Sequence, residues 1–191
     1  MRHRLFISMA GLALIASVSL APAARGNHAG VTCRGFAVTS HDSAGTNGNN
    51  TLNGTPDIDV MQGLGGDDTI NGKGGGDLIC GGDGKDEVNG DGGGDTLDGG
   101  QGADTINGLD GVDGDVNGDA DNDTIFGGDD PDAPEGDGGN DDMFGGTGAD
   151  DLRGEDGTDF LDGGPGLNDY CDSGPPPGDG NDSVACEDGP D

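Results

Sequence analysis

A nine-residue unit recurs almost without interruption between Gly45 and Cys171, and this repeat constrains the fold more than any other feature of the sequence. All 14 units begin with glycine, and the sixth position is aspartate in 12 of them and asparagine in two. The eighth position is apolar in nearly every unit from Leu52 onward. One unit, which begins at Gly108, has a single extra residue. Three positions that stay in phase over this length predict a repetitive solenoid.

Each unit combines a turn with a short strand. Glycines at positions one and four favour a tight turn, because glycine tolerates backbone angles that are closed to other residues. In Asp104-Thr105-Ile106-Asn107, β-tolerant residues flank one apolar side chain, which predicts a strand with a single inward-facing residue. Such strands form a core only when they stack. If two units make one turn of the solenoid, the 14 units give seven turns of an all-β structure with parallel strands.

The composition excludes an ordinary globular core. The 191 residues include 45 glycines and no tryptophan, and 39 acidic residues outnumber seven basic ones, for a formal net charge of −32. Large apolar side chains are too few to fold the chain unaided, so we expect a bound ligand to stabilise the folded form. The acidity argues against nucleic acid and anionic membranes as partners and favours cations. The alternative is a disordered acidic polyelectrolyte that binds cations loosely. Such a chain would need only its charge, and not the strict nine-residue spacing.

The phased carboxylates, together with the carbonyl groups of the glycine turns, predict a metal site in each turn. These are hard oxygen ligands, and Ca²⁺ accepts six to eight of them in flexible geometry, whereas Mg²⁺ demands a strict octahedron. Zinc and copper favour imidazole or thiolate groups, and no histidine or cysteine is in phase with the repeat. The candidate carboxylate ligands are Asp59, Asp68, Asp77, Asp86, Asp95, Asp104, Asp113, Asp123, Asp132, Asp141, Asp150 and Asp159.

The unit resembles the haemolysin-type, or repeats-in-toxin (RTX), calcium-binding nonapeptide, Gly-Gly-x-Gly-x-Asp-x-apolar-x. The segments 81–89, 99–107 and 145–153 match this pattern in full. The resemblance implies a right-handed parallel β-roll, with several Ca²⁺ ions held by the sixth-position aspartates and by carbonyl groups of the glycine turns, and with order that depends on calcium. The implied carbonyl ligands belong to Gly63, Gly72, Gly81, Gly84, Gly90, Gly93, Gly99, Gly102, Gly145 and Gly148.

Several units depart from the pattern. Asn50 and Asn168, at the sixth position of the first and last units, lack a charge, so we expect the terminal sites to be weak or absent. Pro134 stands at an inward position where it cannot donate to the sheet, which predicts a bulge or a bent turn. Many RTX proteins carry a C-terminal export signal, whereas this chain has the features of an N-terminal one.

The two ends of the chain differ from the array. Residues 1–23 combine a basic start, an apolar run and a small-x-small cleavage site, which predicts a secretory signal peptide and an extracellular or cell-surface protein. Residues 24–44 contain a β-prone stretch from Val31 to Thr39 that we expect to cap the open end of the roll at 45–171. Residues 172–191 form a Pro/Gly-rich C-terminal cap or tail. We expect no membrane span after the signal.

The four cysteines predict two disulfides in an exported chain, with three pairings open. Cys171 and Cys186 flank the tail, which favours a bond between them. Cys33 is then left to join Cys80 and tie the N-terminal segment to the roll. Zinc binding is the alternative for these cysteines, and it suits a cytosolic protein better than an exported one.

The sequence offers no catalytic constellation. His41, Asp42 and Ser43 are adjacent in sequence and therefore cannot adopt the geometry of a triad. We expect a non-enzymatic, secreted β-roll that binds multiple Ca²⁺ ions with coupled folding, in a structural, adhesive or surface role. The second hypothesis is a calcium-stabilised, non-catalytic module related to a secreted toxin or hydrolase. A protein or carbohydrate partner at the surface is compatible with either hypothesis, and the sequence does not identify one.

Overall fold

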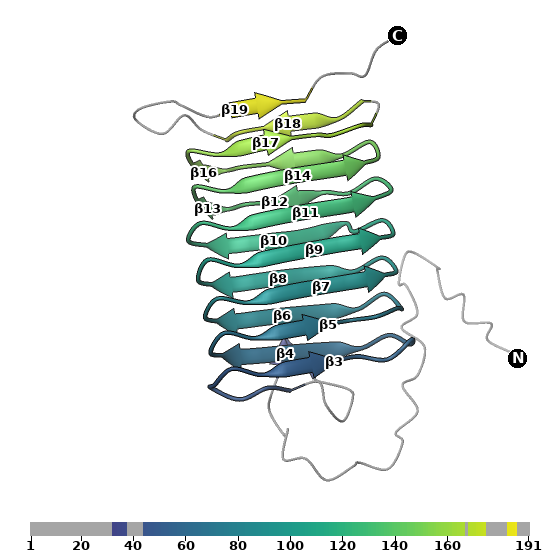
Figure 1. Ribbon diagram of the computed structural model, residues 1–191, viewed down its shortest axis with the longest axis vertical. Coiled ribbons are helices and arrows are strands. Elements are labelled where there is room, and N and C mark those ends of the chain that lie inside the picture. Colours follow the sequence, from purple (N-terminus) through teal and green to yellow (C-terminus); the bar gives the residue numbers. More distant parts are fainter. Residues whose placement is uncertain (1–31, 38–43, 167, 175–182, 187–191) are drawn as a thin grey trace, which may run out of the picture.

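The computed structural model describes residues 32–37, 44–166, 168–174 and 183–186. The predicted signal peptide and parts of both terminal segments lie outside these residues. The described part is a stack of similar turns in which two parallel sheets face each other across a narrow interior (Figure 1). The all-β solenoid predicted from the repeat is confirmed.

Two sheets contain all the strands of the roll. Sheet I has nine strands, which are β4 (Val60–Gly65), β6 (Leu78–Asp83), β8 (Thr96–Gln101), β10 (Asp115–Ala120), β12 (Pro134–Glu135), β13 (Gly138–Gly139), β15 (Asp151–Arg153), β16 (Asp156–Gly157) and β18 (Tyr170–Asp172). Sheet II has eight strands, which are β3 (Thr51–Asn53), β5 (Thr69–Asn71), β7 (Glu87–Gly92), β9 (Thr105–Asp110), β11 (Thr124–Asp129), β14 (Asp142–Thr147), β17 (Phe160–Asp162) and β19 (Ser183–Ala185).

Successive units alternate between the two sheets, so each turn of the solenoid contains two units. In sheet I, for example, Ile79 pairs with Leu97, 18 residues further along the chain. The inward side chains of both sheets form a single buried cluster that runs the length of the stack. Its members are Leu52, Met61, Ile70, Ile79, Val88, Leu97, Ile106, Val116, Ile125, Met143, Leu152 and Leu161. The eighth position of the repeat therefore supplies the core, as predicted.

The two irregular units in the middle of the array keep this register. The extra residue after Asp113 is absorbed before β10, and Val116 still pairs with Leu97. Pro134 is buried at its inward position and pairs with Val116, but its strand is only two residues long. The proline thus shortens a strand of sheet I, and the turn stays in the stack.

The last unit contains a register shift that the sequence pattern did not reveal. Tyr170, expected to face inward, is 56% exposed, and Cys171 instead pairs with Leu152 and packs against the core. The turn that begins at Gly163 is one residue longer than the standard unit, like the turn after Gly108. Cys171 is bonded to Cys186, which follows β19, so the disulfide joins the last strands of the two sheets. This predicted pairing is confirmed.

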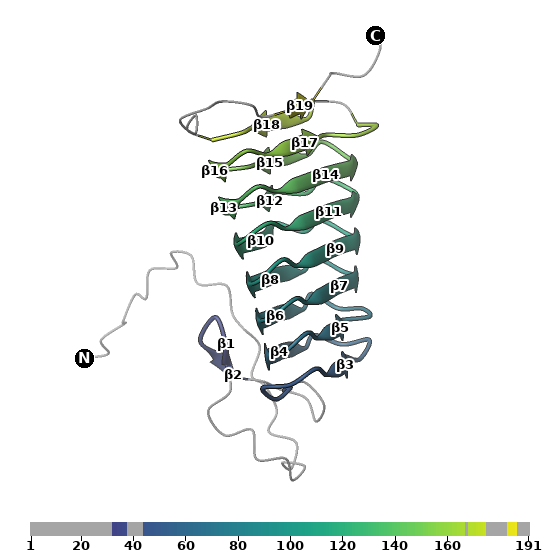
Figure 2. The ribbon, with the colours of Figure 1, turned by 60° about the vertical axis from the view of Figure 1, so that its left-hand side comes forward.

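The N-terminal hairpin lies beside the roll. Strands β1 (Thr32–Cys33) and β2 (Phe36–Ala37) pair antiparallel next to the outer face of sheet I (Figure 2). Cys80 follows inward-facing Ile79 and so faces outward, where it bonds to Cys33 as predicted. The described hairpin lies against a face of the roll, and the cap expected from residues 24–44 stays a prediction. Residues 24–31 and 38–43 of the same segment lie outside the described residues.

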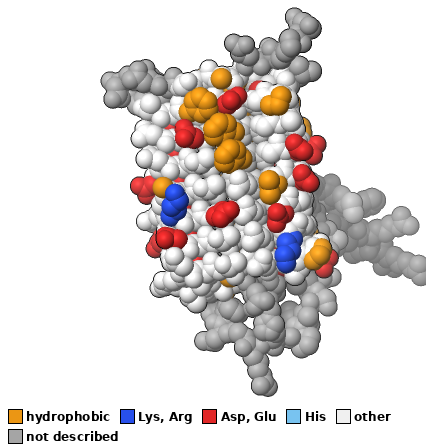
Figure 3. Space-filling view, viewed as in Figure 1, with side chains coloured by type: hydrophobic (Ala, Val, Ile, Leu, Met, Phe, Trp, Pro, Cys, Tyr) orange, Lys and Arg blue, Asp and Glu red, His pale blue; other side chains and the backbone are white. Residues whose placement is uncertain are grey.

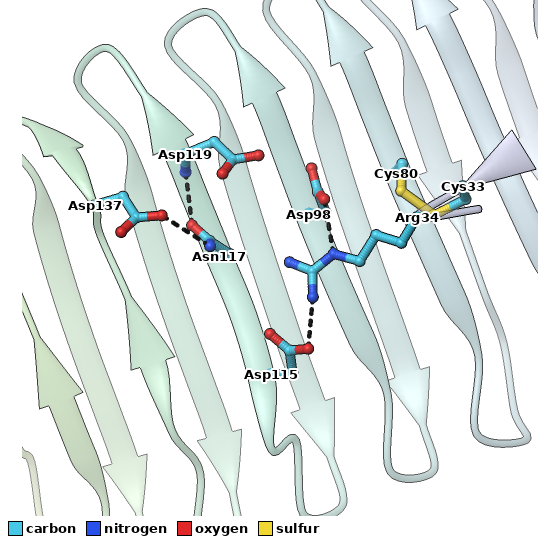
Figure 4. Close-up of polar contacts among 8 residues, drawn as sticks. All are labelled: Cys33, Arg34, Cys80, Asp98, Asp115, Asn117, Asp119 and Asp137. Carbon is cyan, nitrogen blue, oxygen red and sulfur yellow. Dashed lines mark hydrogen bonds and ion pairs between the residues drawn. A yellow bond between two sulfur atoms is a disulfide. The ribbon is translucent and has the colours of Figure 1, made fainter. Parts of the chain in front are cut away.

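Arg34 extends the attachment of the hairpin across two further strands. Its Nε donates to Asp98 Oδ2 at 2.9 Å and its Nη1 to Asp115 Oδ2 at 2.5 Å (Figure 4). Asp98 lies on β8 and Asp115 on β10, so the guanidinium neutralises carboxylates from neighbouring turns. The disulfide and this ion-pair cluster together hold the hairpin on sheet I.

The outer face of sheet II has a polar half and an aromatic half. The ninth positions of its N-terminal strands form an asparagine ladder, in which Asn107 Nδ2 donates to Asn89 Oδ1 at 2.7 Å and Asn89 to Asn71 at 3.1 Å. Further along, Phe126 and Phe144 stack with ring centroids 5.0 Å apart. The hydrophobic side chains accordingly gather toward the C-terminal part of this face (Figure 3).

Candidate metal centre

The sixth-position side chains form two columns along opposite edges of the roll. Column one lies in the turns that lead into sheet II, and column two in the turns that lead into sheet I, because each column residue lies one or two positions before a strand. Column one consists of Asn50, Asp68, Asp86, Asp104, Asp123, Asp141 and Asp159. Column two consists of Asp59, Asp77, Asp95, Asp113, Asp132, Asp150 and Asp169.

Every aspartate from Asp59 to Asp159 in these columns is at most 4% exposed. From Asp68 onward, one oxygen of each column carboxylate connects successive turns: the backbone N–H of Asp86 donates to Asp104 Oδ1 at 2.7 Å, and that of Asp77 to Asp95 Oδ1 at 2.7 Å. The same bond recurs in both columns and fixes the orientation of each side chain. Oδ1 is therefore satisfied by the protein itself.

The second carboxylate oxygen is buried and lacks a hydrogen-bond partner within the described structure. A buried ionised carboxylate carries a large desolvation penalty unless a donor or a cation compensates it. A series of such atoms, repeated turn after turn, fits a cation in each turn. The Oδ2 atoms concerned belong to Asp68, Asp77, Asp86, Asp95, Asp104, Asp113, Asp123, Asp132, Asp141, Asp150 and Asp169.

The position-one glycines keep a small space open beside these oxygens. A Cβ added to Gly99 would lie 2.6 Å from Asp104 Oδ2 and 3.1 Å from the carbonyl oxygen of Gly118 in the next turn. A Cβ on Gly72 would likewise lie 2.5 Å from Asp77 Oδ2 and 2.7 Å from Gly90 O. A carboxylate oxygen and a carbonyl oxygen thus converge on a space that a side chain would fill. Ca²⁺ prefers this donor chemistry.

Most of the carbonyls predicted as ligands lie in such spaces. The carbonyl oxygens of Gly63, Gly72, Gly81, Gly90, Gly99 and Gly145 each approach the position-one glycine of the preceding turn on the same edge. Those of Gly84, Gly93 and Gly148 approach the position-four glycine of the following turn. In the described part of the chain, no three His, Cys, Asp or Glu side chains cluster as a metal site. Any ion in these turns therefore depends on backbone carbonyls as well as on aspartate.

Comparison with known families agrees with this geometry. The profile of the RTX calcium-binding nonapeptide repeat matches in four copies, at residues 44–79, 81–114, 115–133 and 135–170. The chain belongs to the RTX repeat family. RTX repeats bind calcium, and the buried aspartates in the turns of this β-roll fit that chemistry. No curated protein matches the chain.

Burial raises the pKa of aspartates in both columns. Desolvation is the largest cause, and neighbouring carboxylates add to it, while the backbone N–H bond to Oδ1 opposes it. The pKa rises to about 8 for Asp123, to about 7 for Asp77, Asp104 and Asp132, and to about 6 for Asp86, Asp95 and Asp141. Bound Ca²⁺ would reverse this effect by favouring the charged form.

These shifts predict that protons partly replace calcium. Because the folded pKa lies above the unfolded value of about 3.9, each group stabilises the calcium-free fold at low pH, and this contribution is lost as pH rises through about 6 to 8. In buffers stripped of metal on a chelating resin, we expect the β-signal in far-UV circular dichroism to increase as pH falls from 8 to 5. Calcium affinity should change in the opposite direction. A β-content independent of pH would contradict the prediction.

The structure adds one residue that the repeat pattern missed. Asn168 was expected at the sixth position of the last unit, but it is exposed, and Asp169 occupies the column. The N–H of Asp150 donates to Asp169 Oδ1 at 3.1 Å, and Asp169 Oδ2 is buried without a partner in the described structure. The expectation of an uncharged last site is therefore wrong. The sequence did contain a signal for this shift. If the last unit has one extra residue, Asp169 falls at the sixth position and Cys171 at the inward-facing eighth position.

The ion pairs of the described structure lie outside the two aspartate columns. The ion pairs of Arg34 and Arg153 engage Asp98, Asp115 and Asp151, and none of these three carboxylates belongs to the columns. Within the residues that the structure describes, no helix is long and apolar enough to cross a membrane.

Proposed function

We propose that this protein is a secreted RTX β-roll that binds multiple Ca²⁺ ions, folds as it binds them and has a structural or surface role. The observation that carries the proposal is the repeated buried Oδ2 atom without a partner, next to a carbonyl oxygen and a glycine. An apolar core one residue wide per strand gives limited stability, so the free energy of ion binding contributes to folding.

Export is supported by the signal-like residues 1–23 and by two disulfides, which persist in oxidising compartments. A structural role is supported by the β-roll itself, which is not a catalytic module. The proposed partners are Ca²⁺ ions, with adhesion or surface assembly as the use of the rigid roll. The alternative is that the same roll serves as the calcium-stabilised, non-catalytic module of a secreted toxin or hydrolase.

The ligand assignment is tested by two matched aspartates. Asp104 is buried in column one, whereas Asp110 at the end of β9 is exposed and outside both columns. We expect Asp104→Ala to raise the calcium concentration at the midpoint of folding at least about tenfold, by analogy with groups that support metal sites. Asp110→Ala should leave the midpoint nearly unchanged. Calcium titrations followed by circular dichroism measure both, and equal shifts would refute the assignment.

A further inference from the structure

The first turn of each aspartate column differs from the turns that follow. Asp59 Oδ2 accepts the backbone N–H of Thr55 at 2.6 Å and its hydroxyl at 2.9 Å. Asn50 Oδ1 accepts the N–H and hydroxyl of Thr46 at 2.6 and 3.2 Å. In the next turns, by contrast, Asp68 Oδ2 and Asp77 Oδ2 are buried without a partner in the described structure. In the first turns, protein donors thus satisfy the side-chain oxygen whose counterpart in the next turns has no described partner.

The difference arises at position two of the repeat. Thr46 and Thr55 are the only threonines at this position, and neither has a left-handed backbone. In the later turns the residue at position two has a positive φ, as at Leu64 (81°) and Lys73 (80°). A left-handed residue directs its N–H differently, and the N–H of Lys73 donates to Asp91 Oδ2 at 3.0 Å in the next turn. The change of residue and the change of conformation therefore occur together.

Lys73 supplies a cation at the same end of column two. Its ammonium donates to the carbonyl oxygen of Gly54 at 2.8 Å, and the contact is partly buried. Later position-one carbonyls, such as Gly90 O, lie beside an aspartate oxygen of the preceding turn. Gly54 begins the series in column two, so its carbonyl has no such preceding turn in the array. The ammonium group covers this terminal carbonyl with a positive charge.

We infer that the calcium columns begin at Asp68 and Asp77, and that Thr46, Thr55 and Lys73 close the N-terminal end of the roll without a metal ion. This inference rests on the proposed function, because it concerns which turns take Ca²⁺. The carbonyl oxygens of Gly63 and Gly72 approach these first turns as their counterparts do in later turns, so the difference lies in the side-chain oxygen. In the first turns a threonine hydroxyl and an N–H already satisfy that oxygen, so no cation is needed to compensate its burial. The array therefore binds fewer ions than its aspartates suggest.

The decisive comparison is between two isosteric substitutions in one column, made in the full-length protein. Asp59→Asn should leave both the number of bound ions and the calcium midpoint unchanged, because an amide oxygen accepts from Thr55 as Asn50 does from Thr46. Asp77→Asn should lower the number of bound ions by at least one and raise the midpoint at least about tenfold. Equilibrium dialysis with metal analysis counts the ions, and circular dichroism at saturating Ca²⁺ verifies the fold.

A third variant keeps the inference falsifiable if Asp77→Asn does not fold. Thr55→Val preserves shape and removes the hydroxyl, so it should speed amide hydrogen exchange in residues 54–62 and leave the ion count unchanged. Loss of an ion in Asp59→Asn, or unchanged exchange in Thr55→Val, would overturn the inference. Failure of the wild-type protein to bind Ca²⁺ at millimolar concentration would instead overturn the proposed function. The two failures are therefore distinguishable.

Discussion

Removal of calcium at neutral pH is expected to abolish most of the β-structure of this protein. Without the ion, the buried oxygens of both aspartate columns lose their compensating charge, and carboxylates of successive turns repel one another along each edge of the roll. A site held at 100 times its Kd stabilises the fold by about 2.7 kcal/mol, so four such sites contribute about 11 kcal/mol, as much as the whole stability of an ordinary domain.

The measurement is far-UV circular dichroism at pH 7.5 through a calcium titration of protein first stripped of metal. We expect a cooperative change from coil to β-structure, and the same change should be reversed by a chelator. Mg²⁺ at equal concentration is the control, and it should restore less structure because it requires a strict octahedral shell. A β-signal that survives chelation unchanged would contradict the proposed coupling between calcium and folding.

Gly111→Ala is expected to destabilise the roll by about 3 kcal/mol even at saturating calcium. Gly111 has a φ of 128°, and a Cβ there would overlap the carbonyl oxygen of Gly93 in the preceding turn. The cost combines about 1–2 kcal/mol for a left-handed alanine with about 1–3 kcal/mol for overpacking. The carbonyl that would be displaced is also one of the predicted ligands, so calcium affinity should fall with stability.

Gly114, three residues further along, provides a matched control. A Cβ at Gly114 meets no atom within 4 Å and the residue lies outside the left-handed region. Gly114→Ala should therefore change stability by no more than about 0.5 kcal/mol. Urea unfolding at saturating calcium compares the two variants. Equal losses of stability would contradict the prediction. The requirement for glycine would then come from the backbone preference of the region, and not from the close approach of successive turns.

The repeat in the sequence predicted most of the fold and the chemistry of the sites. The phase of glycine, aspartate and one apolar residue predicted parallel strands, a core made by position eight and a ligand set of oxygen atoms. The placement of Cys171 and Cys186 on either side of the tail predicted one disulfide, and exclusion left Cys33 to join Cys80 in the other. The inferences about the fold succeed because each unit carries its own turn and strand signals, and because a strand with one inward residue can be buried only by stacking. The ligand set stays a prediction.

Other properties depend on contacts between turns and were not visible in a single unit. The position-one glycines do not have left-handed backbones; they are required because a Cβ would fill the space between an aspartate oxygen and the next turn's carbonyl. The insertion before Asp169 was not recognised because Asn168 is also compatible with the sixth position of the repeat. The register is decided by the pairing of Cys171 with Leu152. The hairpin lies on sheet I because Cys80 faces outward.

The sequence by itself thus determined that the chain is a β-roll of RTX calcium-binding repeats with one candidate side-chain ligand per unit. Only the tertiary structure decided which aspartates carry an oxygen without a partner. Asp59 and Asp77 occupy the same position of the same repeat, yet Thr55 donates to Asp59 and no described group donates to Asp77 Oδ2. Hydrogen-bond satisfaction is a property of the neighbours in space, and here it is set by the residue and backbone at position two and by the turn stacked 18 residues away.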